Sequence, residues 1–209
     1  MSVRLPTFAR KLFKLTTATL IALITLPTLT LAQGSDAKWD PLKSQANSRT
    51  LQYSASASLL GKPSAVSLKF YCDTTSTKTQ TGALGFDLVI AKVADLAPFG
   101  FEAFEGPDAP AAKRKLLRAT VTRPGKPPLV LNIAPAGWSP DGPNFAFGVS
   151  APSQQAGRNA RTLLRALADG AETLSISITD AKNPKLKLEL SIPVADKAAD
   201  FKALIAGLK

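Results

Sequence analysis

The stretch RNARTLLRALADGAETLSISITDAKNPKLKLELSIPVADKAADFKALIAGL, residues 158–208, decides the fold. Its first eleven residues have a helical period, with leucines on one face and arginines on the other. These side chains are Leu163, Leu164 and Leu167, and Arg158, Arg161 and Arg165. Asp169-Gly170 predicts the end of the helix, because glycine readily adopts the left-handed conformation that closes many helices.

The same stretch then changes to a period of two. Apolar residues occupy every second position in 174–178 and again in 186–192, with a turn-rich segment at 180–184 between them. This pattern predicts two neighbouring β-strands. A last helix follows, because four apolar residues at its positions form a single stripe. They are Phe201, Leu204, Ile205 and Leu208.

The upstream chain predicts further strands with the same alternation. They cover residues 51–60, 66–72, 82–91, 115–123, 128–134 and 144–150. Turns at Gly61-Lys62-Pro63 and at residues 123–127 predict two hairpins. Hairpins in sequence favour antiparallel sheets with one face buried. We therefore expect an α+β, β-rich fold, an antiparallel β-sandwich with two amphipathic helices in the C-terminal half packed against one sheet or edge.

The remaining segments are predicted as connections. Residues 73–81 are polar throughout and predict a surface loop. Residues 134–144 are rich in proline and glycine, and they predict a long irregular loop. Ser153 is expected to cap the N-terminus of the first helix.

The N-terminus predicts an export signal. Residues 1–32 contain a basic start without acids, an apolar core and small residues around Ala32. A membrane anchor is the alternative, since the apolar run is near the lower length limit for spanning a bilayer. Pro27 and the polar residues after Ala32 favour cleavage before Gln33. No cysteine follows that position to accept a lipid, so we expect a bacterial periplasmic or secreted protein without a transmembrane segment.

Cleavage leaves a mature chain of 177 residues, the size of one domain. Residues 33–50 predict a flexible mature N-terminus that docks through Trp39, and residues 51–209 a single β-rich domain. The signal peptide removes four basic residues and no acidic ones, so the formal charge falls from +11 to +7. A positive charge favours an acidic protein face, anionic polysaccharide or lipid head groups as partners. Nucleic acid is not expected for an exported protein, and the oligomeric state stays open.

The chain has no histidine and one cysteine, Cys72. Without imidazole, the common general base of serine and cysteine hydrolases is missing. Zinc, copper and haem sites also depend on histidine or cysteine, so no cofactor is expected. Cys72 falls on the inward side of its alternating strand, which predicts a buried thiol. An intermolecular disulfide and a redox-active thiol are the alternatives.

Two basic surfaces are the candidate partner-binding sites. They consist of Lys113, Arg114, Lys115 and Arg118, and of Arg158, Arg161 and Arg165. The favoured function is a non-enzymatic envelope protein that binds a protein partner or an anionic envelope component, as an accessory in secretion or virulence. The alternative is a hydrolase of envelope polysaccharide that uses Glu102 and Glu105. These carboxylates lie in the most aromatic segment, and glycosidases combine paired carboxylates with rings that stack on sugars.

The order of elements also carries a resemblance. A Trp near the mature N-terminus precedes a strand that ends Leu68-Lys-Phe-Tyr-Cys72, and a Leu-Leu-x-x-Leu helix, Gly170 and two strands follow much later. The chain closes with Phe201-Lys-Ala-Leu-Ile205. In this order it resembles small exported proteins of the invasion-associated locus B type and periplasmic accessory proteins of type VI secretion. The resemblance covers mainly the last third and implies a β-rich envelope protein without catalytic residues. Such proteins tend to have additional cysteines, which this chain lacks.

Overall fold

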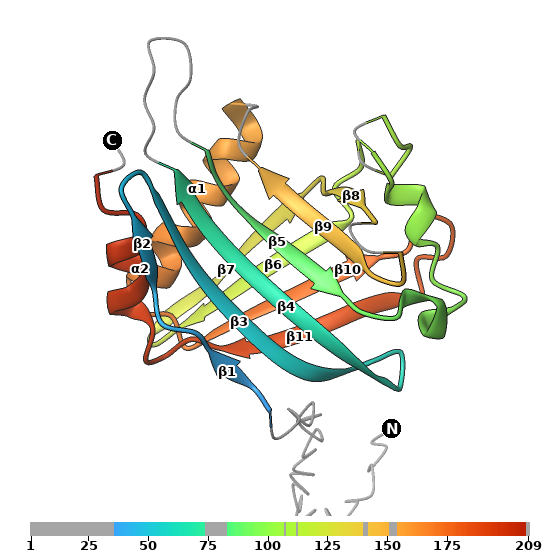
Figure 1. Ribbon diagram of the computed structural model, residues 1–209, viewed down its shortest axis with the longest axis horizontal. Coiled ribbons are helices and arrows are strands. Elements are labelled where there is room, and N and C mark those ends of the chain that lie inside the picture. The colour runs from blue at the N-terminus through green and yellow to red at the C-terminus, as the bar shows by residue number, and fades with distance from the viewer. Residues whose placement is uncertain are drawn as a thin grey trace, which may run out of the picture. The chain divides into compact units, whose positions relative to one another are not determined.

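Two antiparallel sheets make up most of the computed structural model, which describes residues 36–73, 83–106, 108–111, 113–139, 142–150 and 154–207 (Figure 1). The large sheet has the order β1-β3-β4-β5-β9-β8, with β2 paired to β3. Its strands are β1 (Lys38–Trp39), β2 (Lys43–Gln45), β3 (Ser48–Leu59), β4 (Lys62–Asp73), β5 (Leu84–Ile90), β8 (Ala136–Trp138) and β9 (Phe145–Ser150). The small sheet has the order β11-β10-β6-β7, formed by β6 (Leu117–Arg123), β7 (Lys126–Ile133), β10 (Thr173–Thr179) and β11 (Lys187–Pro193). The helices are α1 (Gln154–Ala168), α2 (Ala198–Leu204) and the short 3-10 helices η1 (Val93–Leu96) and η2 (Phe101–Phe104).

The predicted fold class is confirmed, because both sheets are antiparallel and both C-terminal-half helices are present. Three predictions fall outside the described residues: the signal peptide of residues 1–32, the polar loop over residues 74–81 and the Ser153 helix cap. The last helix is described up to its end at Leu204 and the turn that follows it.

The hairpin of β3 and β4 is the longest part of the large sheet, and its alternation places every second side chain in the core. Leu51 and Phe70 are opposite each other and both 0% exposed. The two-residue turn Leu60-Gly61 joins the strands, with φ angles of 50° and 77°. Positive φ at both turn residues suits the right-handed twist of a hairpin. The sequence predicts this turn at residues 61–63, one residue too late, since Pro63 already pairs within the ladder.

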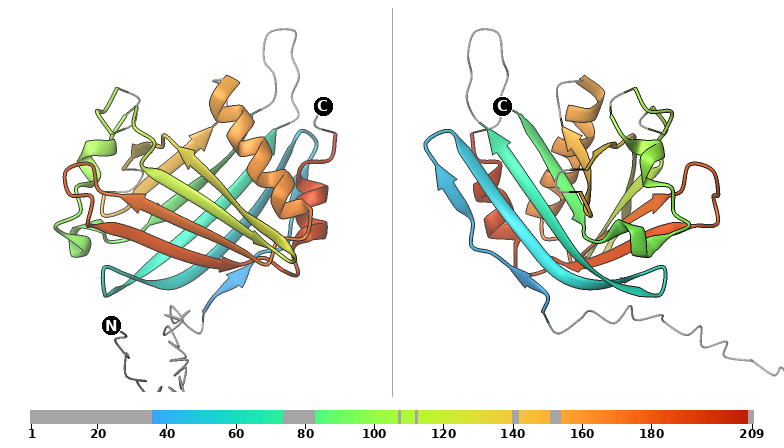
Figure 2. Two further views of the ribbon diagram at one scale, coloured as in Figure 1. Left: turned by 180° about the vertical axis from the view of Figure 1, so that it is seen from behind. Right: turned by 45° about the vertical axis from the view of Figure 1, so that its right-hand side comes forward.

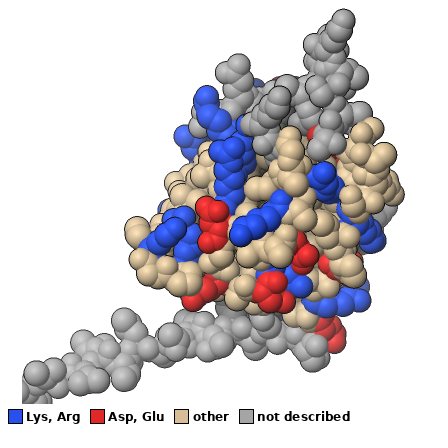
Figure 3. Space-filling view, turned by 90° about the vertical axis from the view of Figure 1, so that its left-hand side faces the viewer, with Lys and Arg blue, Asp and Glu red and all other residues tan. Residues whose placement is uncertain are grey.

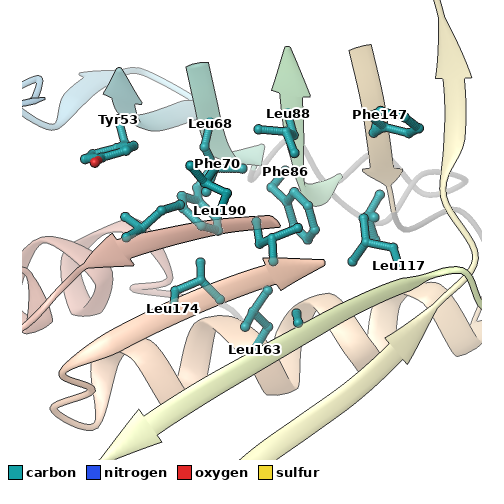
Figure 4. Close-up of a cluster of buried hydrophobic side chains, with 14 of the residues drawn as sticks. Tyr53, Leu68, Phe70, Phe86, Leu88, Leu117, Phe147, Leu163, Leu174 and Leu190 are labelled. Atoms are coloured by element: carbon teal, nitrogen blue, oxygen red, sulfur yellow. The ribbon is translucent and has the colours of Figure 1, made fainter. Parts of the chain in front are cut away.

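The core lies between the two sheets. Figure 4 shows Leu68, Phe86 and Phe147 of the large sheet pointing toward Leu117 and Leu174 of the small sheet. All five side chains are 0–1% exposed. Burying a side chain of this size stabilises a fold by about 1.5–3 kcal/mol relative to leaving it exposed. The contact between the sheets is therefore the main source of hydrophobic stabilisation.

The two α-helices cover one end of the sandwich (Figure 2). α1 packs against β5 and β9 of the large sheet and against β6 and β7 of the small sheet. Its leucines Leu163, Leu164 and Leu167 are 0–1% exposed. α2 packs against α1 and β3, and both Phe201 and Leu204 are fully buried. The predicted burial of the apolar helix faces is confirmed, but α1 packs against both sheets, whereas the sequence predicted packing against one sheet or edge.

Residues 38–50 differ from the sequence-based expectation of a flexible, irregular N-terminus. They contain β1, β2 and the first residues of β3. β1 and β2 both pair antiparallel with β3, so backbone hydrogen bonds to a long neighbour order this segment. Strands of two and three residues show no alternation, because a period of two needs more positions to become visible.

Trp39 docks as predicted. Its ring centroid lies 5.2 Å from that of Tyr53, 6.4 Å from Phe70 and 5.8 Å from Phe201. Its indole Nε1–H donates a hydrogen bond to the carbonyl oxygen of Pro193 at 3.0 Å. Trp39 thus joins the start of the described chain to β3, β4, α2 and the end of β11.

The prediction of an irregular loop over residues 134–144 is wrong for β8, which pairs antiparallel with β9 at the edge of the large sheet. Gly137 faces the core, since a Cβ there would clash with the Phe145 ring and lie 3.1 Å from the carbonyl oxygen of Phe104. Side chains alternate along a strand. Trp138 therefore lies on the outer face of the sheet.

The aromatic segment around η2 closes the other end of the sandwich. Phe99, Phe101 and Phe104 are 5%, 6% and 0% exposed. Their rings pack on one another and on Phe145 and Phe147 of β9. The sequence indicated an aromatic loop, and the structure makes it part of the core.

Asp180 anchors this segment to the loop between β10 and β11. Its carboxylate is 3% exposed and accepts hydrogen bonds from the backbone N–H groups of Gly100, Lys182 and Asn183. The distances are 2.7, 2.7 and 2.6 Å. Burial raises the pKa of the Asp180 carboxyl, but the three N–H donors and the charge of Lys182 outweigh it and the pKa is lowered. The carboxylate is therefore held in its charged form.

Candidate partner-binding surface

The first predicted surface is one side of α1. Arg158, Arg161 and Arg165 are exposed, whereas Leu163 and Leu167 on the other side are fully buried. Residues three and four apart share one face of a helix. The three guanidinium groups consequently project from the same side, and the buried leucines rather than the arginines attach the helix to the sheets. We call Arg158, Arg161 and Arg165 the arginine stripe.

The chemistry of the arginine stripe suits oxyanions. A guanidinium is planar and permanently charged, and it binds a carboxylate or phosphate through two parallel hydrogen bonds. Part of the pattern has a local structural explanation: Arg165 lies in the last helical turn, where a cation stabilises the helix by about 0.3–1 kcal/mol. That explanation applies to Arg165, the arginine in the last turn.

Arg49 on β3 adds to this side of the molecule, and sequence reasoning missed it. Burial raises the pKa of the Cys72 thiol, and the charges of Arg49 and Arg161 both oppose that shift. Arg49 is the cross-strand partner of Cys72 in the pairing of β3 with β4. The Arg49 guanidinium also donates a hydrogen bond to the carbonyl oxygen of Ala206, just after α2. Because Arg49 and Ala206 are far apart in sequence, no local pattern could have connected them.

Figure 3 shows this side of the molecule. Basic side chains predominate in the upper part of the view, at the height at which α1 runs in Figure 1. Acidic side chains lie mostly in the lower part. Lys and Arg side chains also lie among the acidic side chains in the middle and lower parts of this view.

The second predicted surface is the segment that leads into β6. Lys113 Nζ lies 3.7 Å from Asp108 Oδ1 in an ion pair whose side chains are both strongly exposed. Exposed ion pairs of this kind contribute only about 0–1 kcal/mol. The Arg114 guanidinium donates a hydrogen bond to the carbonyl oxygen of Ala181 at 2.7 Å, and Lys115 is exposed. At least two of these cations thus have partners within the protein.

The structure does not bring the two basic surfaces together. Arg118 lies near the start of β6, and its Nε–H points to Asn132 Oδ1 on β7 at 3.4 Å. Figures 1 and 2 place the segment before β6 beside η2, at the end of the sandwich away from α1. The arginine stripe and the segment of Lys113 to Arg118 are therefore two separate candidates.

Glu102 and Glu105, the carboxylates of the hydrolase alternative, are both exposed. Glu102 belongs to η2 and Glu105 follows it, while the neighbouring Phe101 and Phe104 point into the core. A glycosidase needs rings that can stack on the sugar beside its carboxylates. The rings of this segment are buried, so they do not form such a platform.

Cys72 is fully buried and free, which confirms its predicted inward orientation. Within the described ranges, no three side chains of His, Cys, Asp and Glu gather closely enough to hold a metal ion. Of the helices in the described part of the chain, none has the length and apolar content to cross a bilayer.

Fold and surface together define a β-sandwich domain with an exposed basic helix face. No protein-family model and no curated protein matches this sequence.

Proposed function

We infer that this chain is an exported, non-enzymatic envelope protein that binds an acidic protein partner or an anionic envelope component through the arginine stripe. The observation that carries the proposal is the division of α1 into two faces. Its leucines are buried against both sheets, and its three arginines are exposed on one side. Side chains that the fold does not need for packing, and that share one charge and one direction, suit recognition of carboxylates or phosphates.

Two observations support export to the envelope. The N-terminal sequence has a basic start, an apolar core and small residues around Ala32, and the chain resembles locus B proteins and type VI accessory proteins. The absence of histidine from the sequence supports a binding role over catalysis. A charge of +7 on the mature chain supports an acidic partner.

The test is a charge reversal of the stripe, Arg158→Glu/Arg161→Glu/Arg165→Glu. Binding to periplasmic partners, to anionic vesicles and to an acidic polysaccharide is measured for the variant and for wild type. We expect the variant to lose binding and to stay folded, with a modestly lower unfolding temperature, because glutamate at position 165 places a negative charge in the last helical turn. Wild-type binding should weaken as salt rises, because exposed charges are screened beyond roughly 8–10 Å at physiological ionic strength.

The matched control is Lys113→Glu/Lys115→Glu/Arg118→Glu, with the same change in charge at the other end of the sandwich. Loss of binding only in this control would move the partner site to the segment before β6. Equal binding by both variants and wild type would refute a role for either basic surface.

The hydrolase alternative is tested with Glu102→Gln/Glu105→Gln. Retained partner binding and no turnover of peptidoglycan by wild type agree with the binding role. If wild type turns over peptidoglycan and this variant does not, the hydrolase function would replace the binding role.

A further inference from the structure

We propose that the outer face of the large sheet binds an uncharged saccharide. A sugar ring packs on the indole of Trp138, and its hydroxyl groups bind the carboxylate of Asp87 and the polar groups of a nearby groove. This site involves β4, β5, β8 and β9 and does not use the arginine stripe.

Trp138 is the first element of the site. Its side chain is 41% exposed, and among the described residues only Val130 is another large apolar side chain with such exposure. The indole is nevertheless held in place by the sheet. A Cβ at Gly148 would lie 2.5 Å from its Cζ3 and 2.8 Å from its Cη2, so the ring rests directly on the β9 backbone. A ring fixed in this way offers a large apolar surface and loses little conformational freedom when a ligand binds.

Asp87 borders the indole. It lies opposite Gly148 in the pairing of β5 with β9, and its Oδ1 is 3.2 Å from the same Cβ position. Lys69 lies opposite Asp87 on β4. Burial raises the pKa of the Asp87 carboxyl, and the charge of Lys69 opposes that shift. A half-buried carboxylate thus lies beside an exposed aromatic ring on an otherwise flat sheet face.

A groove of about 430 Å³ lies on the same side of the large sheet, and its lining includes Val89, two residues from Asp87 on β5, but neither Asp87 nor Trp138. Ser54, Ser67, Ala65 and Val89 are part of its lining, and Asn144 lies at the same groove. Cross-strand pairing connects it to the indole, because Ser67 is opposite Val89, Val89 opposite Ala146, and Ala146 opposite Trp138. Its volume falls within the range of about 300–1,000 Å³ that is usual for small-ligand sites.

The lining indicates the chemical class of the ligand. One face of a pyranose ring presents C–H groups that pack on an indole, and its hydroxyl groups both donate to carboxylates and bind serine and amide groups. Charges near the groove are balanced, with Asp36 next to Lys38 and Asp87 next to Lys69. An anionic or a cationic ligand would meet a like charge at each pair. The groove lining combines serine side chains with apolar alanine and valine side chains, which suits the hydroxyl groups and the C–H faces of a sugar.

The experiment uses an array of uncharged oligosaccharides, with hexose and N-acetylhexosamine oligomers, followed by calorimetric titration of each hit. We expect saturable binding that does not change with salt. Trp138→Ala should weaken it at least about tenfold, as truncation of a tryptophan anchor does in other interfaces. Asp87→Asn should weaken it less, because the amide keeps one acceptor. Val130→Ala, which removes the exposed apolar side chain of the small sheet, should leave affinity unchanged.

A second variant tests whether the position of the Trp138 ring matters in addition to its presence. Gly148→Ala retains Trp138 but displaces its indole, and it should weaken binding in a protein whose thermal unfolding is close to that of wild type. No binding to any uncharged oligosaccharide, or equal affinity of wild type and Trp138→Ala, would overturn the proposal. Binding that disappears with rising salt would also overturn it. The arginine-stripe variant should bind the oligosaccharides of the array as wild type does. The saccharide proposal and the arginine-stripe proposal can therefore be refuted independently of each other.

Discussion

Replacement of Asp180 should reveal how the aromatic segment is held against the sandwich. Asp180→Ala removes a carboxylate that accepts three backbone hydrogen bonds at 2.6–2.7 Å. The N–H groups of Lys182 and Asn183 belong to a surface turn and can bind water instead. Gly100 is half-buried, whereas Lys182 and Asn183 are exposed, and leaving a buried donor without an acceptor costs about 1–3 kcal/mol. With the weakened turn included, we expect a loss of about 2–3 kcal/mol in the free energy of unfolding.

The same interaction predicts a pH dependence. The pKa of Asp180 is lowered in the folded protein. Its contribution to stability is therefore fully present above the unfolded pKa of about 3.9 and is lost as pH falls through the folded value. Urea unfolding of wild type and Asp180→Asn at neutral pH and at about pH 3 measures this, since the difference between them should shrink in acid. A difference that stays constant over this range, or an Asp180→Ala variant as stable as wild type, would refute the account.

Two further predictions concern the half-buried Trp39 and the fully buried Cys72. Trp39→Phe should cost about 1 kcal/mol in urea unfolding, because it keeps an aromatic ring but loses the hydrogen bond to Pro193. Trp39→Ala should cost clearly more, and equal effects of the two substitutions would mean that the ring contacts contribute nothing. Cys72 should react with thiol reagents only upon unfolding, and Cys72→Ala should lower stability without changing the oligomeric state measured by light scattering. Fast labelling of the native protein, or a dimer that reduction dissociates, would contradict the buried position.

Apolar periodicity was sufficient to predict the long elements. Leu163 and Leu167 identify the buried side of α1, and the alternation around Leu68 and Leu174 identifies inward positions of both sheets. In each case a local pattern repeats often enough to indicate both the type of element and its buried face. The sheet order does not follow from these patterns, because β10 pairs with the much earlier β6 as well as with its neighbour β11.

The candidate sites were less predictable, because local sequence patterns do not determine contacts between distant segments. The sequence indicated the arginine stripe, since its spacing is local to one helix. It did not indicate that Arg49 binds the carbonyl of Ala206, or that Arg114 binds the carbonyl of Ala181, because these contacts join distant segments. The proposed saccharide site was not predicted from the sequence. Trp138 lies within a predicted loop, and its contact with Gly148 depends on the pairing of β8 with β9.

Gly85 and Gly148 lie on the outer face of the large sheet, and a side chain at each would meet different neighbours. A Cβ at Gly85 would clash with the carbonyl oxygen of Val149, so the backbone itself requires glycine there. At Gly148 the three nearest atoms belong to the side chains of Trp138 and Asp87. Glycine inside a strand weakens the strand, and it often marks a place of close approach. Glycine at 148 therefore lets the indole lie against the sheet beside Asp87, and that is the arrangement on which the proposed sugar contact depends.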